Sequence, residues 1–403
     1  MELLGKSFHL AGKVQHYAWG GFSFIPNLLG IANEGNKPCA EYWMGAHPSA
    51  SSIITDGKNS VSLNEYIKSN PSKTINDVVF NRFGELPYLF KILDVKDMLS
   101  IQVHPTKIEA EKGFDAEEAA GIPVTASNRN YKDRNHKPEV MVALSEFWLL
   151  HGFKPQSELL KTLQDIKEFT VLIGLFKFNG YKGLYQFVME MDQADVDNML
   201  TPLVEREIRR KGDGELTKAE PGWWVCKLFE GGQEIKNIDR GIFSIYFFNI
   251  VKANPGEAVF QGAGIPHAYL EGQNVELMAN SDNVLRGGLT PKHIDVPELM
   301  KHTAFEPVIP NVMTGNDVGN NEVIYPCPVP DFGIKKISLN ANKHQSTATS
   351  LEIIIAIEGG AVLNSSTSNL VIKQGEVVAI LPTEEYSIES TGKCVLYKAF
   401  VPA

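Results

Sequence analysis

The stretch LSIQVHP, residues 99–105, has the alternation of a short β-strand that ends at a proline. Successive side chains of a strand point to opposite faces, so the apolar residues 99, 101 and 103 share one face. Gln102 and His104 share the other face. An antiparallel strand with one wetted face would give the same pattern without any function. The alternative is that Gln102 and His104 point inward together and bind a common ligand.

Composition limits the classes of protein to which the chain can belong. Its 403 residues are too many for one ordinary core and predict two or three domains. The excess of 48 acidic over 38 basic residues argues against a nucleic-acid-binding surface. The four cysteines form no CxxC pair, which predicts reduced thiols and a cytoplasmic protein. We find no signal peptide and no apolar run of about 20 residues, so no membrane partner is expected.

The sequence divides into three consecutive parts by its hydrophobic pattern. Short strand-like runs separated by turns fill residues 1–152, return from about Ile242, and continue to the end. Between them, apolar residues recur at helical spacing, as in the run Leu184–Met191. We therefore predict a mainly β protein with an α-helical insertion. The predicted domains are a discontinuous catalytic barrel (1–152 and 237–305), a helical insertion domain (153–236) and a C-terminal barrel (306–403).

A faint internal repeat links the two β regions. NPGEAVFQGAGIPHAYLEG, which begins at Asn254, parallels KQGEVVAILPTEEYSIES, which begins at Lys373. Each has a Gly-Glu pair, an apolar strand, a loop and a proline, although a generic hairpin could look the same. His267 follows the proline in the first copy, whereas Thr383 does so in the second. Repeated antiparallel strands of this spacing suggest two jelly-roll barrels, of which the second lacks metal ligands.

Four polar residues could together bind a metal ion. Gln102 and His104 share a strand face, Glu139 directly precedes the apolar run VMVAL, and His267 lies in GIPHAYLEG. Taken alone, a residue of each of these types more often has a structural role than a functional one. Together they offer two imidazoles, one carboxylate and one amide oxygen, which suits Zn²⁺ or a similar divalent ion. One carboxylate among three neutral donors leaves the ion a Lewis acid that favours developing negative charge.

Basic residues gather near these candidate ligands. Lys107 comes just after His104, and Arg286 lies downstream of His267. In a chain with net negative charge, such clustering favours the binding of a phosphate, although a solvated basic loop would look the same. Four more basic residues fall within nine positions: Arg129, Lys132, Arg134 and Lys137.

At these residues the sequence closely resembles the type I mannose-6-phosphate isomerases, which are zinc-dependent phosphomannose isomerases of the cupin superfamily. The matching segments span most of the chain outside the helical insertion and the final barrel, and the last of them is long and idiosyncratic. They are HYAWGG (16–21) with AEYWMGAHPSASS (40–52), PYLFKILDVKDMLSIQVHPTK (87–107), YKDRNHKPE (131–139), and GIPHAYLEGQNVELMANSDNVLRGGLTPKH (264–293).

The resemblance implies a fold, a reaction and a cofactor. It implies two cupin-type barrels with a helical domain, and the interconversion of mannose 6-phosphate and fructose 6-phosphate. The ketose forms when a base removes the C2 proton and the enediolate is reprotonated at C1. The resemblance further implies one zinc ion per chain, bound by Gln102, His104, Glu139 and His267, with Arg286 in the active site. A sugar phosphate is then the expected partner, and we expect a monomer.

The catalytic base is left open among several residues. Lys137 is our first candidate, because neighbouring cations favour its neutral amine. Glu276 is the second candidate, Asp282 is a further competitor, and His136 could assist ring opening as a proton shuttle. Other residues are expected to contact the substrate or shape its pocket: Lys107 and Lys91 for substrate oxygens, Tyr269 for the sugar, and Glu41 for the pocket wall.

Two other functions remain as alternatives. Two histidines and a carboxylate also make the iron site of a cupin-type non-haem oxygenase, although Gln102 would then take a position that oxygen chemistry usually leaves open. The third reading is a sugar-phosphate-binding cupin without turnover. Binding alone would not need the ligands, the nearby lysines and Arg286 together, which argues against that reading.

Overall fold

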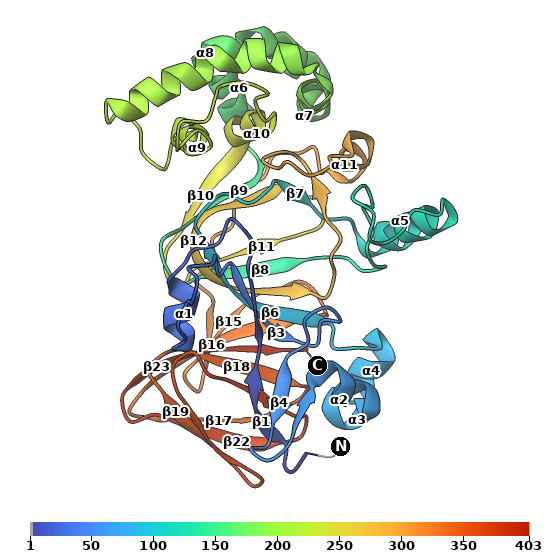
Figure 1. Ribbon diagram of the computed structural model, residues 1–403, viewed down its shortest axis with the longest axis vertical. Helices are drawn as coiled ribbons and strands as arrows, with labels where there is room; N and C mark the ends of the chain where they lie inside the picture. The colour runs from blue at the N-terminus through green and yellow to red at the C-terminus, as the bar shows by residue number, and fades with distance from the viewer. Residues whose placement is uncertain (1–2, 403) are drawn as a thin grey trace.

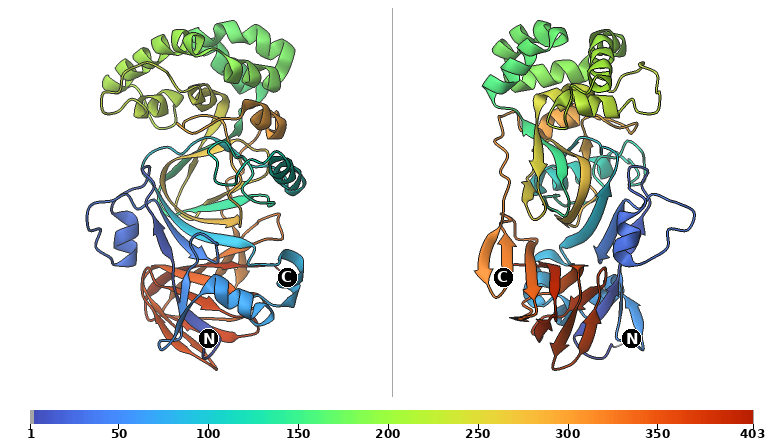
Figure 2. Two further views of the ribbon diagram at one scale, coloured as in Figure 1. Left: turned by 45° about the vertical axis from the view of Figure 1, so that its right-hand side comes forward. Right: turned by 90° about the vertical axis from the view of Figure 1, so that its left-hand side faces the viewer.

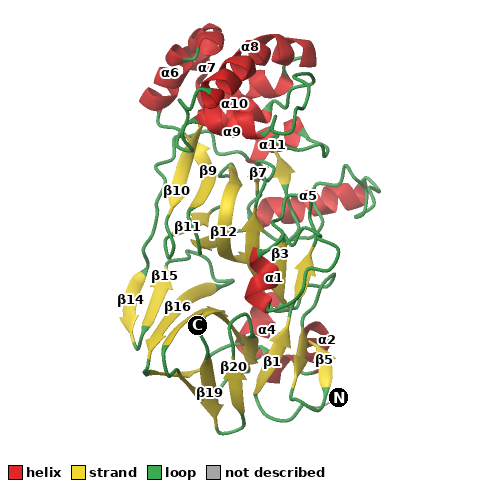
Figure 3. Ribbon diagram, turned by 60° about the vertical axis from the view of Figure 1, so that its left-hand side comes forward, coloured by secondary structure: helices red, strands yellow, loops and turns green. Residues whose placement is uncertain are grey.

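The computed structural model describes residues 3–402. Helices gather at one end of its long axis, a central β region follows, and a C-terminal β region forms the other end (Figures 1 and 3). The protein is mainly β, and its named strands pair antiparallel. None of the helices between residues 3 and 402 combines the length and apolar character needed to cross a bilayer.

The central β region is a ten-stranded sheet whose long strand β12 pairs with β6, β8 and β9. Alternation along these strands separates two faces. Lys91 lies opposite Glu276 on the inner face, whereas Ile92 and Val275 pack on the outer face. The strands are β2 (Lys13–Gln15), β3 (Glu41–Gly45), β6 (Tyr88–Val95), β7 (Gln102–Val103), β8 (Glu139–Ala143), β9 (Phe147–Phe153), β10 (Phe248–Ala253), β11 (Ala258–Gln261), β12 (His267–Ala279) and β13 (Leu285–Arg286).

The C-terminal β region consists of two sheets that enclose an apolar core, with Ile354 and Ile388 on facing strands. The nine-stranded sheet contains β1 (Ser7–Ala11), β4 (Ile53–Thr55), β5 (Ser60–Ser62), β14 (Asn316–Gly319), β15 (Glu322–Tyr325), β16 (Gly333–Asn340), β18 (Glu352–Glu358), β21 (Val377–Ile380) and β23 (Lys393–Phe400). The four-stranded sheet contains β17 (Lys343–Thr347), β19 (Ala361–Ser365), β20 (Asn369–Ile372) and β22 (Glu385–Glu389). A shared core joins this region to the outer face of the central one.

The helices of the insertion pack around buried residues such as Leu184, Val188 and Trp224. They continue to Phe247, so the prediction that strands return from about Ile242 is wrong by about one and a half helical turns. The run GIFSIYF is apolar on every side, and periodicity alone does not separate a buried helix from a buried strand. The helices are α6 (Gln156–Asp165), the 3₁₀ helix η1 (Lys167–Leu172), α7 (Ile173–Glu190), α8 (Gln193–Gly212), α9 (Pro221–Lys227) and α10 (Gly241–Phe247).

The N-terminal part of the chain contributes to both β regions. Strand β1 pairs with β21, with His9 opposite Val378, and the N-terminal strand lies against the C-terminal strands in Figure 2. Contrary to the prediction, residues 1–152 therefore do not all belong to the central region. The alternating pattern of a strand indicates that it has a covered face but not which strand it pairs with. Helices also interrupt residues 1–152, where we expected strands. They are α1 (Phe24–Leu29), α2 (Leu63–Ser69), α3 (Pro71–Thr74), α4 (Asp77–Phe83) and α5 (Lys107–Ala119). A further helix, α11 (Val296–His302), follows β13.

The two copies of the predicted repeat have matching turns. The backbone N–H of Asn254 donates to the carboxylate of Glu257 at 2.7 Å, and that of Lys373 donates to Glu376 at 2.9 Å. The glycine before each glutamate has a positive φ, and strands β11 and β21 follow. The repeat is thus visible in the local backbone and not only in the sequence.

Candidate metal centre and substrate cavity

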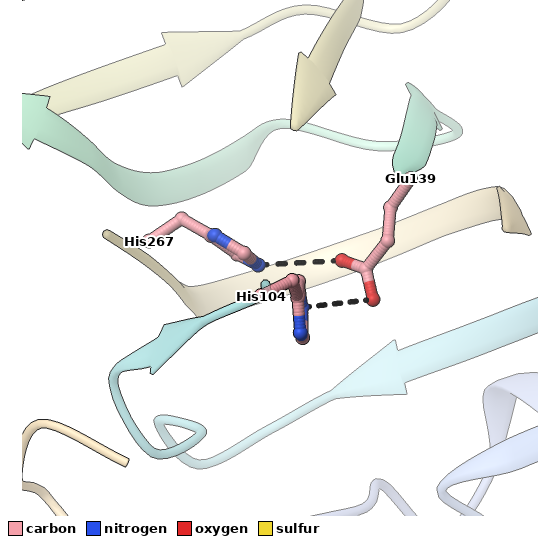
Figure 4. A group of neighbouring side chains, drawn as sticks. All are labelled: His104, Glu139 and His267. Atoms are coloured by element: carbon pink, nitrogen blue, oxygen red, sulfur yellow. Dashed lines mark ion pairs between the residues drawn. The ribbon is translucent and has the colours of Figure 1, made fainter. Parts of the chain in front are cut away.

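Three predicted ligands meet inside the central β region. His104 follows β7, Glu139 begins β8 and His267 begins β12, and all three are buried. One potential ligand atom from each lies within 4.8 Å of the others. Glu139 bridges the two imidazoles, with one carboxylate oxygen 3.5 Å from His104 Nε2 and the other 3.3 Å from His267 Nε2 (Figure 4).

Both histidine rings are oriented from behind by backbone carbonyls. His104 Nδ1 lies 2.8 Å from the carbonyl oxygen of Asn283, and His267 Nδ1 lies 2.9 Å from that of Ile265. A carbonyl oxygen can only accept, so each Nδ1 carries the proton and each Nε2 presents its lone pair to Glu139. Burial, followed by the charge of Lys137, lowers the pKa of His104 to about 4, which keeps the ring neutral at pH 7.

The carboxylate of Glu139 is held in its charged form. Burial favours the neutral acid, but Lys137 and His104 outweigh it and hold the pKa of Glu139 well below its ordinary value. Lys137 Nζ lies 2.6 Å from Glu139 Oε1. A charged carboxylate is the form in which Glu139 can bind a divalent metal, and the neutral ring of His104 is the form in which an imidazole can do so.

Gln102 lies next to this group through strand pairing. It is the residue opposite His267 on β12 and also opposite Arg286 on β13. Its side chain lines a cavity of about 680 Å³, whereas the three buried ligand candidates lie behind the cavity wall. Gln102 and Lys137 therefore connect the buried group to the cavity.

The donor set fits a divalent metal ion. The Nε2 atoms of His104 and His267 are buried, and neither has a hydrogen-bond partner within residues 3–402. Two unpartnered imidazole nitrogens facing one carboxylate are costly unless a further group satisfies them. Nitrogen and oxygen donors without a thiolate suit zinc. Gln102, which lies opposite His267 in the strand pairing, is the predicted fourth donor through its amide oxygen.

Other predicted site residues form a polar cluster deep in the same region. Lys91 Nζ lies 2.6 Å from Glu276 Oε2 and 3.7 Å from Glu41 Oε2. The indole N–H of Trp43 donates to the same oxygen of Glu41. Burial raises the pKa of Glu276 although Lys91 opposes the rise, and the two carboxylates keep Lys91 charged. Lys91 and Glu41 line the cavity, but Glu276 lies behind them.

Tyr269 and Asp282 occupy different environments. Tyr269 is buried against Phe147, and burial followed by Glu276 raises its pKa well above the usual value. Its hydroxyl has no hydrogen-bond partner in the described chain. Asp282 lines the cavity with a half-exposed side chain, and a hydrogen bond from His47 lowers its pKa.

Lys107 and His136 lie outside both the cavity and the buried clusters beside it. Lys107 begins helix α5 with a half-exposed side chain, and its ammonium donates to Asn135 at 3.0 Å. His136 lies 3.0 Å from Asp331 of the C-terminal β region. The structure therefore does not bring Lys107 or His136 to the group formed by Gln102, Lys137 and Arg286.

Most of the basic cluster at residues 129–137 is neutralised within the protein. The guanidinium of Arg129 is buried and pairs with Glu117 and Glu118 of α5. Arg134 pairs with Asp115 of the same helix. The ammonium of Lys132 donates to the carbonyl oxygens of residues 124 and 126. The expectation that these three residues form a phosphate site is therefore wrong, and only Lys137 of the cluster lines the cavity.

Lys292 is a cation of the cavity wall that we did not predict from the sequence. Lys292 lines the cavity together with Arg286, and burial followed by the charge of Arg286 lowers its pKa. The segment LTPKH that carries it lies only a few residues after Arg286, and that proximity was the available signal. Ser100, Tyr17 and Thr290 add hydroxyl groups to the same wall.

Comparison with known proteins identifies close relatives over nearly the whole chain. Residues 7–156 match the family model of the catalytic domain of type I phosphomannose isomerase. The chain is 40% identical over 389 residues to the mannose-6-phosphate isomerase of Salmonella typhimurium, covering 95% of this chain and 96% of that protein. It is 32% identical over 417 residues to the human mannose-6-phosphate isomerase, covering 95% of each.

Solved structures give the same picture. The mannose 6-phosphate isomerase of Salmonella typhimurium, bound to fructose 6-phosphate and zinc, superposes with a TM-score of 0.88 at 37% identity. That match covers 99% of this chain and 100% of the other. A zinc-bound mannose 6-phosphate isomerase also superposes with a TM-score of 0.88, at 36% identity.

Proposed function

The chain belongs to the type I phosphomannose isomerase family, and we propose on that premise that its cavity interconverts mannose 6-phosphate and fructose 6-phosphate. The observation that carries the proposal is the arrangement around Glu139. Two neutral imidazoles present unpartnered Nε2 atoms to this carboxylate, and Gln102 and Lys137 link the group to the cavity.

The cofactor of the reaction is one zinc ion per chain, for which the protein offers His104, Glu139, His267 and Gln102. When bound, zinc supplies a Lewis acid that stabilises negative charge on a substrate oxygen. The backbone carbonyls behind both histidines hold the rings ready for binding. The chain thereby avoids the cost of ordering these ligands when the metal arrives.

Lys137 is our proposed base for the C2 proton. Its side chain lines the cavity, whereas Glu276 lies behind Lys91 and Glu41. A base must come within hydrogen-bond distance of the proton it removes, and this requirement favours Lys137. The ammonium of Lys137 pairs with Glu139, and it would release its proton more readily with a dication bound at Glu139. The neutral amine would then accept the C2 proton, and the resulting ammonium would return a proton at C1. Glu276 remains the second candidate, and the charged Lys91 beside it can bind a sugar oxygen.

Ring opening precedes this step, because the substrate exists largely as a closed sugar. Asp282 lines the cavity and accepts a hydrogen bond from His47. We therefore propose that Asp282 transfers the proton in ring opening. A role for His136 as the shuttle stays a prediction, and its contact with Asp331 does not support it.

The phosphate group of the substrate is proposed to bind beside Arg286. Arg286 and Lys292 share one wall of the cavity, and burial followed by the charge of Arg286 lowers the pKa of Lys292. Two neighbouring cations repel each other until an anion lies between them, so a phosphate dianion relieves their repulsion. Tyr269 and Glu41 are proposed to shape the part of the cavity nearer the sugar.

Further features of the molecule are proposed from the family and from its elements. We propose that both β regions are cupin-type jelly-roll barrels, supported by the paired turns at Glu257 and Glu376. We propose a monomer in the cytoplasm. The four cysteines are free of disulfides within residues 3–402, which is consistent with a reducing compartment.

A coupled assay that follows the formation of fructose 6-phosphate tests the proposed function. Mannose 6-phosphate should be converted by the zinc-loaded chain, and the activity should disappear on chelation and return with zinc. The variant Glu139→Gln keeps the size of the side chain and should lose zinc and activity together. Oxygen uptake with iron and no conversion of mannose 6-phosphate would instead favour the oxygenase.

A further inference from the structure

The C-terminal β region contacts the segment that carries the metal ligand and the proposed base. His136 Nε2 lies 3.0 Å from Asp331 Oδ1, and these residues are 195 positions apart. Asp331 is buried, with 2% of its surface exposed, and its second carboxylate oxygen has no partner among the described residues. A carboxylate can only accept, so the imidazole N–H donates this bond.

The backbone around His136 explains why this contact matters for the site. Pro138 restricts Lys137 to an extended conformation, and β8 begins at the following residue. In an extended chain, alternate side chains share a side, so Lys137 and Glu139 point together. Lys137 Nζ indeed lies 2.6 Å from Glu139 Oε1, whereas the His136 ring is directed to the C-terminal β region.

Asp331 itself has a rigid support. The next residue, Phe332, is fully buried in the core shared by the two β regions, and β16 follows at Gly333. The C-terminal β region thus offers a fixed hydrogen-bond acceptor to the segment of the site. Such a bond selects one orientation of the backbone at His136, and hence one direction for Lys137.

Other bonds hold this segment on both sides of His136. Before it, Asn283 accepts from the backbone N–H of Lys132, and Asn135 donates to the carbonyl oxygen of Asn280. After it, the backbone N–H of Ala279 donates to the carbonyl oxygen of Pro138 at 3.1 Å, and Glu139 pairs with Met278 in the central sheet. Between these anchors, the bond from His136 to Asp331 ties the side chain of residue 136 to the C-terminal β region. The direction of Lys137 therefore depends on the C-terminal β region, whereas the central sheet itself holds Glu139.

We propose that Asp331 is a positioning residue, which acts through His136 to direct Lys137 toward the cavity and to keep the contact of Lys137 with Glu139. This inference rests on the proposed function where it concerns Lys137 as the base and on the metal site where it concerns the contact with Glu139. It assigns a task to the C-terminal β region, which lacks the metal ligands of the central one.

The test compares Asp331→Ala with Asp331→Asn, because the amide of asparagine can still accept the bond from His136. Asp331→Ala should lower kcat by about 10-fold to 100-fold while the KM for mannose 6-phosphate changes little. Asp331→Asn should recover most of that loss. Release of zinc to a coloured chelator should also be faster in Asp331→Ala, by about 10-fold.

A matched control separates positioning from general destabilisation. Glu352 is a buried carboxylate of the same β region, and it accepts a hydrogen bond from Tyr386, which belongs to that region as well. Glu352→Gln should lower the melting temperature and leave kcat near the wild-type value. If both variants lower kcat equally for an equal loss of melting temperature, the proposal is wrong.

A double-mutant comparison tests whether Asp331 acts through His136. His136→Leu alone should lower kcat, and adding Asp331→Ala should cause little further loss, because leucine has no donor and both changes remove the same bond. Losses that multiply would show independent roles and contradict the proposal. If the wild-type chain does not convert mannose 6-phosphate, the proposed function fails, and the rate of zinc release still decides the role of Asp331.

Discussion

Replacing Lys91 by Met should destabilise the central β region strongly. Lys91 is the cation of a buried cluster, 2.6 Å from Glu276 and 3.7 Å from Glu41, and the side chains of all three are at most 10% exposed. At an effective dielectric constant of about 20, the shorter contact contributes about 6 kcal/mol of attraction. Desolvation offsets part of this attraction, and removing one partner of a buried pair typically costs about 3–5 kcal/mol.

The pH dependence of the Lys91→Met variant follows from the carboxylate that remains. Burial raises the pKa of Glu276 above 4.5, and loss of Lys91 raises it further. A folded-state pKa above the unfolded value means that the folded chain binds the proton more tightly, so lowering the pH stabilises it. The deficit of the variant should therefore shrink as the pH falls from 7 toward 5.

Equilibrium urea unfolding followed by tryptophan fluorescence measures the effect, because Lys91 Nζ lies 5.7 Å from the centre of the Trp43 ring. The double variant Lys91→Met/Glu276→Gln removes both charges and should recover at least about 2 kcal/mol of the loss. A loss below about 1 kcal/mol for Lys91→Met would refute this reasoning. So would a double variant less stable than the single one.

Three further predictions concern the metal centre and the cavity. Lys137→Met should lower kcat by about 10²-fold to 10⁴-fold and abolish exchange of the C2 proton with solvent, measured by NMR; near-wild-type exchange would exclude Lys137 as the base. Arg286→Lys should raise KM for mannose 6-phosphate by about 10-fold in steady-state assays, because lysine lacks the guanidinium fork, and an unchanged KM would place the phosphate elsewhere. Burial lowers the pKa of His151 to about 4, so its contribution to stability is present above pH 6.5 and lost as the pH falls toward 4. His151→Gln should remove about 3 kcal/mol of that acid dependence in unfolding titrations, and an unchanged slope would contradict it.

The metal centre was largely predictable because its donors are chemically distinctive. His104, Glu139 and His267 were chosen by residue type and by their place beside apolar strands, and the fold brings their ligand atoms within 4.8 Å. The predicted alternation between an apolar and a polar face is also seen at residues 101–103. Ile101 and Val103 are fully buried in an apolar core, whereas Gln102 faces the cavity.

The charged residues around the site were less predictable, because their role depends on distant partners. Arg129 and Arg134 read as a possible phosphate site in the sequence, but the carboxylates of α5 neutralise both. The local sequence does not indicate that the segment 107–119 folds against residues 129–134. For the same reason, the pairing of His136 with Asp331 was not foreseeable.

The partition of the fold failed where the local pattern was ambiguous. Helix α10 consists of buried residues throughout, so its sequence fits a strand as well as a helix. Strand β1 has an ordinary alternating pattern, and its pairing with β21 depends on a partner about 370 positions away. A pattern of burial predicts that a strand has a covered face but not which sheet it joins.

The fate of the hydrogen at C2 tests the central claim most directly. Mannose 6-phosphate deuterated at C2 is incubated with the zinc-loaded chain in ordinary water, and the products are followed by NMR. Fructose 6-phosphate should form with part of the deuterium lost to water, because Lys137 exchanges its proton with solvent before it is returned at C1. Absence of fructose 6-phosphate would contradict the proposed function, and complete transfer of deuterium to C1 would contradict proton transfer through an exchangeable base.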